Sequence, residues 1–189
     1  MDIEVLRNVE PDQDWVNLHG EYDQFHVYGD YDLHEDYVEY TAALMQKAAI
    51  TCFAFPFYIH FEGYEDEIDS IVLHQRDFPI YYQNSGRTVL TTSDGKTYHA
   101  EIPSFTVKII NEDSLQKAFA EWFHLAMENC MWIVTQSNDL YYKNQFAHID
   151  MEQQSIILLA DHDAHSVSFI TNDPSYRKED YLRLVFEDV

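Results

Sequence analysis

Between residues 112 and 129, apolar side chains recur at intervals of three and four residues, the spacing that places them on one face of an α-helix. The stripe is made of Leu115, Ala118, Phe119, Trp122, Phe123, Ala126, Met127 and Cys130. Asn111 or Asp113 can cap the start of the helix, and Asn129 can take a left-handed conformation at its end. A stripe this broad must be covered, so the rest of the chain has to supply a core.

Short segments with strand-like patterns lie on both sides of this helix. We predict strands at residues 24–28, 51–61, 71–74, 78–82, 88–92, 96–102, 105–110, 131–135, 140–142, 146–149, 155–160 and 166–171. Asp94-Gly95 predicts a hairpin with a type I′ turn, and residues 84–87 predict another turn. Pro56 argues against a central place for the strand at 51–61, although both its sides are largely apolar, because proline cannot donate to a strand ladder.

Two more segments have helical character. Residues 32–49 predict a helix, and residues 176–187 predict a closing helix, with a strand as the alternative. These elements together indicate an α+β fold, in which two or three helices pack on an antiparallel or mixed β-sheet. We expect one domain over residues 1–189, with two lobes, 1–110 and 111–189, as a variant of this organisation.

The composition favours a folded protein of the cytoplasm. At 189 residues and 46% hydrophobic side chains, the chain can bury a substantial core. Its acidic start lacks the features of a secretory signal, and its longest apolar run, residues 50–61, is shorter than the roughly 20 residues that a membrane-spanning helix needs. Cys52 and Cys130 lie in apolar segments, as buried free thiols do.

The strongest compositional signal is the net charge of −23, from 34 acidic and 11 basic residues. Binding to nucleic acid or to an anionic membrane is disfavoured, because both depend on cationic side chains. The negative charge is concentrated in residues 1–70, which contain 17 acidic residues and only two basic ones, Arg7 and Lys47.

Acidic and aromatic side chains alternate within this N-terminal third. The candidate partner-binding residues are Asp23, Tyr28, Asp30, Tyr31, Asp32, Glu35, Asp36 and Glu39. Opposite charge speeds the encounter with a basic protein, and buried aromatic side chains supply much of the binding energy. A solvated acidic face that keeps the protein soluble is the alternative interpretation.

In general character, a small acidic α+β protein of this kind resembles the immunity proteins and inhibitors that neutralise basic toxins, nucleases among them. The resemblance lies in composition only, without matching residues. It implies a binding protein that captures a cationic partner and offers carboxylates where nucleic-acid phosphates would sit.

A polar cluster between two predicted strands gives a second, weaker candidate site. Asp161, His162, Asp163 and His165 are residue types that bind divalent metal ions, and His148 and Asp150 could join them. A metal-dependent hydrolase is therefore an alternative function. A turn that joins two apolar strands is expected to carry such polar residues anyway, which is the structural interpretation of the cluster.

Other catalytic signatures are missing from the sequence. His60 and Glu62 share one strand face and could form a site with His74, although single histidines in strands are more often structural. No G-x-S-x-G nucleophile motif occurs, and the five glycines form neither a P-loop nor a dinucleotide fingerprint. No cofactor is expected beyond the weakly indicated metal, and a structural or regulatory subunit is the third function considered.

The charge leads to a prediction that does not depend on function. A folded chain of net charge −23 repels itself, so salt from about 0.05 to 0.5 M is expected to raise its melting temperature by screening this repulsion. Thermal unfolding followed by circular dichroism at several salt concentrations tests this. A melting temperature that stays constant or falls would mean that the acids are already paired or well dispersed.

Overall fold

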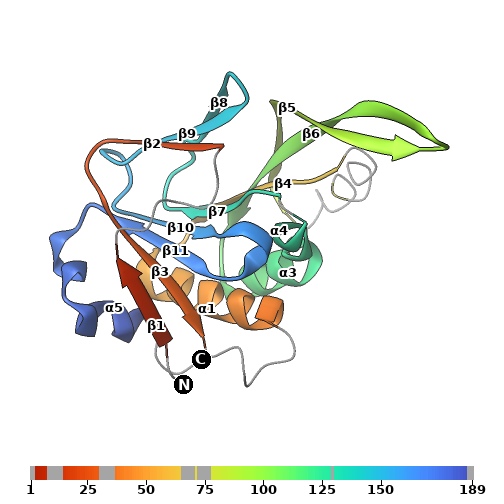
Figure 1. Ribbon diagram of the computed structural model, residues 1–189. Coiled ribbons are helices and arrows are strands. Elements are labelled where there is room, and N and C mark those ends of the chain that lie inside the picture. Colours follow the sequence, from red (N-terminus) through yellow and green to blue (C-terminus); the bar gives the residue numbers. More distant parts are fainter. Residues whose placement is uncertain are drawn as a thin grey trace.

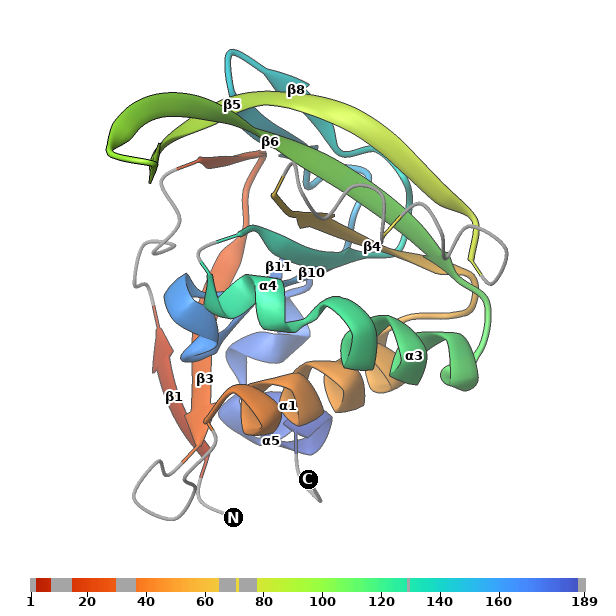
Figure 2. The same cartoon turned by 90° about the vertical axis from the view of Figure 1, so that its right-hand side faces the viewer.

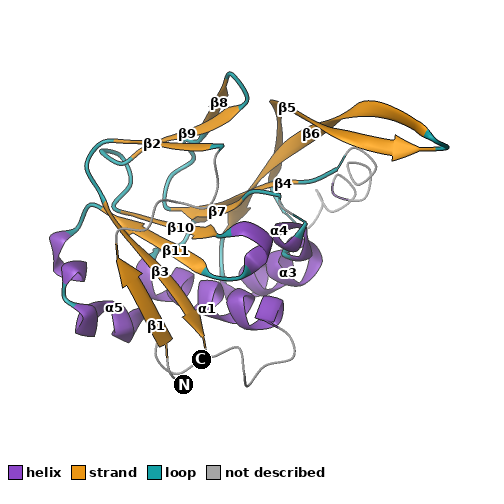
Figure 3. Ribbon diagram, viewed as in Figure 1, coloured by secondary structure: helices purple, strands orange, loops and turns teal. Residues whose placement is uncertain are grey.

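The computed structural model describes residues 3–7, 15–29, 37–64, 71, 78–128 and 130–186. Within this part of the chain, eight strands form the main sheet, three form a small sheet, and helices pack on one side (Figures 1 and 3). The predicted single-domain α+β fold is therefore confirmed. No helix in the described ranges combines the length and apolar character needed to cross a bilayer.

Every neighbouring pair of strands in the main sheet is antiparallel. In spatial order the strands are β1 (Ile3–Arg7), β3 (Asp23–Gly29), β11 (Val167–Thr171), β10 (Ile156–Ala160), β7 (Trp132–Thr135), β4 (Phe57–Glu62), β6 (Lys96–Ile109) and β5 (Ile80–Ser93). The small sheet has the order β2 (Val16–His19), β9 (Phe146–Asp150) and β8 (Tyr141–Lys143). Because β2 runs parallel to β9 and β8 antiparallel, this second sheet is mixed.

The main sheet is covered on both faces, which explains its continuous apolar strands. One face packs on α1 (Tyr37–Cys52), α3 (Glu112–Trp122), α4 (His124–Met127) and α5 (Glu179–Phe186), as Figure 2 shows. The small sheet covers the other face. Along β10, Leu158 belongs to the helix-side core, whereas Ile157 and Leu159 belong to the core beneath the small sheet.

Helix α3 begins as its sequence predicts. Asn111 is the N-cap, and its side chain accepts a hydrogen bond from the backbone N–H of Ser114. The predicted single helix is interrupted at Phe123: the N–H of Phe123 still donates to Phe119 four residues back, but that of Ala126 donates to Phe123 three residues back. The predicted stripe is wrong at Met127: the tighter turn buries Leu125 beside Ala126 and leaves Met127 44% exposed. Asn129 lies outside the described residues.

The conflict at Pro56 is resolved by the position of the strand. Helix α1 runs on to Cys52, the Phe55–Pro56 peptide bond is cis, and β4 starts only at Phe57. The predicted strand over 51–61 therefore starts too early. Proline lies just before the ladder and removes none of its hydrogen bonds, so β4 can occupy a central place between β6 and β7.

The predicted turn at residues 84–87 is instead an irregularity within the long strand β5. The register with β6 shifts between Asn84 and Arg87, and Gly86 has φ of 71°. The hairpin at Asp94-Gly95 is confirmed, because these residues have φ of 52° and 72°, as a type I′ turn requires. The outer part of the β5–β6 hairpin extends away from the body of the molecule (Figure 1).

The two cysteines are free. Cys130 is buried as predicted, whereas Cys52 is half-buried at the end of α1. Burial raises the pKa of the Cys52 thiol to about 12, so the reactive thiolate form is disfavoured there.

Candidate functional site

The structure describes three of the eight candidate partner-binding residues. Asp23 begins β3, Tyr28 lies near the end of the same strand, and Glu39 lies in the first turn of α1. The other five are Asp30, Tyr31, Asp32, Glu35 and Asp36, which lie outside the described residues. The segment between β3 and α1 therefore carries most of the predicted surface.

Asp23 already has a cationic neighbour. Its Oδ2 accepts a hydrogen bond of 2.8 Å from Nε of Arg177, in the short helix η5 (Pro174–Arg177). This pair lines a groove of about 400 Å³ with Glu21, Tyr22 and Asn172. The negative charge of Asp23 is thus partly countered within the chain.

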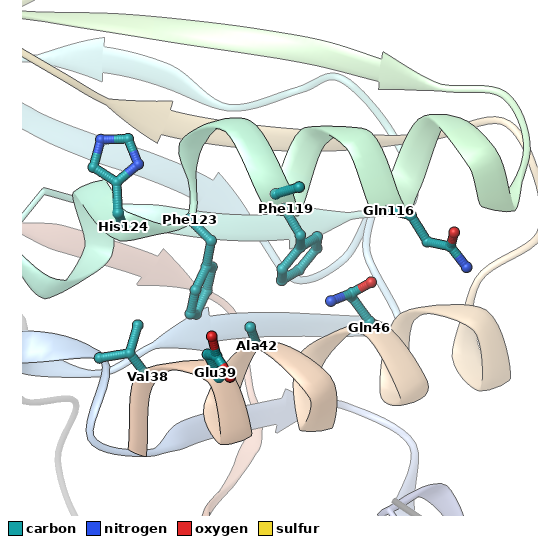
Figure 4. Close-up of a pocket in the computed structure, with 9 residues that line it drawn as sticks. Val38, Glu39, Ala42, Gln46, Gln116, Phe119, Phe123 and His124 are labelled. Carbon is teal, nitrogen blue, oxygen red and sulfur yellow. The ribbon is translucent and has the colours of Figure 1, made fainter. Parts of the chain in front are cut away.

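Glu39 lines a groove of about 420 Å³ between α1 and the α3–α4 segment (Figure 4). The groove is lined by Val38, Glu39, Ala42, Gln46, Gln116, Phe119, Ala120, Phe123 and His124. In Figure 4, the rings of Phe119 and Phe123 point from the upper helices toward α1, while Gln46 and Gln116 lie together at one end. An apolar interior with amides and a carboxylate at its edges can hold a long side chain that has a polar end.

The helical period explains why residues of α1 line one side of this groove. Its buried face consists of Tyr40, Thr41, Leu44, Met45, Ala48 and Ala49, which pack into the core. Glu39, Ala42 and Gln46 are spaced by three and four residues, so they form an adjacent stripe. Glu39 is exposed and Gln46 half-buried, which leaves this stripe open to solvent.

The second candidate site lies next to the first. The ring of Tyr37, at the start of α1, stacks on the ring of His165 with 4.4 Å between centroids and 13° between planes. His165 closes the short helix η4 (His162–Ala164), which packs against α4. The start of α1, the groove and the Asp161–His165 cluster therefore lie close together.

Within that cluster, Asp161 is turned inward and is only 3% exposed. Its Oδ2 lies 2.9 Å from Nδ1 of His26 and also accepts from Ser166, and its Oδ1 accepts from Ser168 at 2.6 Å. The amide nitrogen of Gln24 donates to Nε2 of His26 at 3.1 Å, so Nδ1 carries the proton and donates to Asp161. Both oxygens of this carboxylate are used to hold the turn.

The remaining members of the cluster are exposed or half-buried. Nδ1 of His162 lies 3.1 Å from a carboxylate oxygen of Asp163, whose φ of 56° is left-handed. Over the described ranges of the chain, no group of three or more His, Cys, Asp or Glu side chains is arranged to hold a metal ion. In the small sheet, the ring of His148 is hydrogen-bonded to His19 and stacks on Tyr141. The metal site at residues 161–165 thus stays a prediction.

A buried ionic network between the two sheets was not predicted from the sequence, although Glu62 was considered there as part of a site with His60 and His74. Glu62 is fully buried and forms an ion pair with Arg87, while the hydroxyl of Tyr142 donates to Ser104 at 2.9 Å and lies 3.2 Å from Glu62. Burial raises the pKa of Glu62, against the opposing effect of Arg87. The Arg87 guanidinium stacks 4.2 Å above the ring of Trp15. His60, on the same strand face as Glu62, is held separately between two threonines.

Comparisons with protein-family models, with curated proteins and with solved structures gave no match. The fold and the site therefore define the protein only as an α+β domain of two stacked sheets, with a groove between α1 and the α3–α4 segment.

Proposed function

We propose that this chain is a binding protein that captures a basic protein partner at the end where α1, α4 and η4 meet. The observation that carries the proposal is the position of Glu39, an exposed carboxylate in a groove with two phenylalanine rings. This groove opens beside the most acidic third of a chain whose net charge is −23.

The groove suits a lysine or arginine side chain of such a partner. Its stem can lie on Val38 and Ala42, above the buried rings at the bottom of the groove. Its charged head can reach the carboxylate of Glu39. Gln46 and Gln116 add amide oxygens that accept hydrogen bonds from a guanidinium or ammonium group. The surrounding acids attract the partner over a longer range and speed its encounter.

An inhibitor of the immunity-protein or nucleic-acid-mimic type is the form of this function that the charge favours. Carboxylates spaced along the acidic segment would occupy the site where a basic enzyme binds phosphates. No observation on the described residues favours the metal-dependent hydrolase or the structural subunit over this function.

Replacing Glu39 tests the groove directly. Co-purification from the native cell, with proteins identified by mass, provides the partner, and titration calorimetry then compares Glu39→Gln with Glu101→Gln. Glu101 is an exposed carboxylate on the projecting β5–β6 hairpin, so both variants lose the same charge. We expect Glu39→Gln to weaken binding by roughly tenfold or more, as loss of a central contact does, and Glu101→Gln to have little effect.

Salt dependence tests the electrostatic part. The complex is expected to dissociate as salt rises from about 0.05 to 0.5 M, because screening removes the long-range attraction. A complex that survives at the higher concentration, or equal losses in the two variants, would contradict the proposal.

A further inference from the structure

Two histidines are in direct contact on the small sheet, far from each other in sequence. Nε2 of His19 lies 2.8 Å from Nδ1 of His148, and the rings lie edge to edge with 5.0 Å between centroids and 7° between planes. The pairing of β2 with β9 brings these rings together. The contact takes no part in the groove or in the Asp161 network.

The strand register places both rings on the outer face of the small sheet. His19 pairs with Asp150, which lies two residues beyond His148 on β9. The alternate positions, such as Val16 and Ile149, are buried against the main sheet. His19 is exposed and His148 half-buried, so an ion from solvent can reach both rings beside the Asp150 carboxylate.

The hydrogen bonds determine where the protons lie. Nε2 of His148 is 3.4 Å from the carbonyl oxygen of Lys143, which can only accept, so this nitrogen carries the proton. Nδ1 of His148 then has a lone pair and accepts from Nε2–H of His19. A backbone carbonyl that holds the far nitrogen of an imidazole is the arrangement that orients metal-binding histidines.

The type of ligand indicates the kind of ion. The distance of 2.8 Å between Nε2 of His19 and Nδ1 of His148 is that of an N–H···N hydrogen bond, which a bound ion would replace. Imidazole nitrogens bind Zn²⁺, Ni²⁺ and Cu²⁺, and among these divalent ions a given nitrogen site has the highest affinity for Cu²⁺.

We propose that His19 and His148 form a surface site for a divalent late transition-metal ion, with Cu²⁺ preferred. When the ion binds, the proton of His19 moves from Nε2 to Nδ1, and Nε2 of His19 and Nδ1 of His148 become the two ligands. Rotation of the rings about χ2, which is a soft torsion for histidine, turns both lone pairs toward the ion. Water completes the coordination, and Asp150 adds a negative charge beside it.

Titration of the full chain with Cu²⁺, followed by electron paramagnetic resonance, tests the site. We expect one equivalent to bind with a spectrum of two nitrogen ligands, and Zn²⁺ to bind more weakly. His19→Ala and His148→Ala should each weaken Cu²⁺ binding by at least about tenfold. Loss of a residue that only orients a metal ligand already weakens metal binding by about that factor, and these variants lose the ligand itself. His99→Ala, which removes an exposed histidine of the β5–β6 hairpin, is the matched control and should bind as the wild type does.

Two results would overturn this proposal. One is Cu²⁺ binding of wild-type affinity in the double variant His19→Ala/His148→Ala, and the other is a wild-type spectrum that contains a single nitrogen ligand. Far-UV circular dichroism confirms that each variant is folded, and His19→Gln and His148→Gln replace the alanine variants if either is not.

Discussion

Acidification from pH 6.5 toward pH 3 is expected to destabilise this protein through one histidine, His60. Its ring is completely buried, and this burial lowers its pKa from 6.5 to about 3. In this pH range the unfolded chain binds a proton at His60 that the folded chain does not bind. The free energy of unfolding therefore falls with decreasing pH, by about 1.4 kcal/mol per unit from this residue.

The hydrogen bonds around His60 explain why the neutral ring is retained. The hydroxyl of Thr135 donates to the carbonyl oxygen of Ser137 at 2.8 Å, so its oxygen accepts from Nε2–H of His60 at 2.9 Å. Nδ1 then carries the lone pair and accepts from the hydroxyl of Thr106 at 2.8 Å. A second proton would remove this last bond and place a charge in the core.

Urea unfolding between pH 7 and pH 4 measures this effect. His60→Leu removes the titrating group, so the slope of unfolding free energy against pH should become shallower by about 1.4 kcal/mol per unit. A loss of stability that is the same at every pH does not change this slope. His99→Leu, at an exposed position of the β5–β6 hairpin, is the control and should keep the wild-type slope. Equal slopes in wild type and His60→Leu would show that His60 does not limit stability in acid.

The second large effect is expected from Arg87→Ala. This substitution leaves the carboxylate of Glu62 fully buried without its cationic partner, which typically costs about 3–5 kcal/mol. The lost stacking on Trp15 adds to this cost. Burial already raises the pKa of Glu62, and removing Arg87 leaves only the hydrogen bonds from the N–H of Met131 and the hydroxyl of Tyr142 to oppose it. The folded variant then holds a proton at Glu62 that the unfolded chain releases, so the deficit is largest at neutral pH and shrinks as pH falls.

Urea unfolding at pH 7 and pH 5 checks both parts of this prediction. Lys96→Ala removes one positive charge at the exposed hairpin tip and should change the unfolding free energy by no more than about 0.5 kcal/mol. The double variant Arg87→Ala/Glu62→Gln should recover much of the loss, because no buried charge remains. If Arg87→Ala behaves like Lys96→Ala, the ion pair contributes little to stability.

Much of the fold could be predicted from periodicity. The stripe around Leu115 and Trp122, the turn at Asp94-Gly95 and the run at residues 156–160 depend on neighbours within a few positions, where helical and strand periods act. The errors occurred where non-local packing decided the outcome. Strand β4 starts only after Pro56, later than predicted. Gly86 lies at an irregularity inside the one long strand β5, where a turn between two strands was predicted.

The candidate site was only partly accessible from the sequence. Charge and composition identified the acidic segment and the polar cluster, and Glu39 was among the predicted residues. The stacking of Tyr37 on His165 and the presence of Glu39 and Phe119 in one groove could not be inferred, because residues far apart in sequence carry no period that links them. The same holds for Glu62 and Arg87, whose ion pair joins a central strand to the edge strand of the main sheet.

The sequence by itself determined the classes of element, the acidic third and the absence of common catalytic motifs, because these are local or compositional properties. The tertiary structure alone decided that the helix stripe faces a main sheet covered on both sides. It also decided that the start of α1, the groove and the Asp161–His165 cluster lie close together. Strand order and helix docking set these proximities, and both depend on long-range burial of apolar surface that no short stretch of sequence encodes.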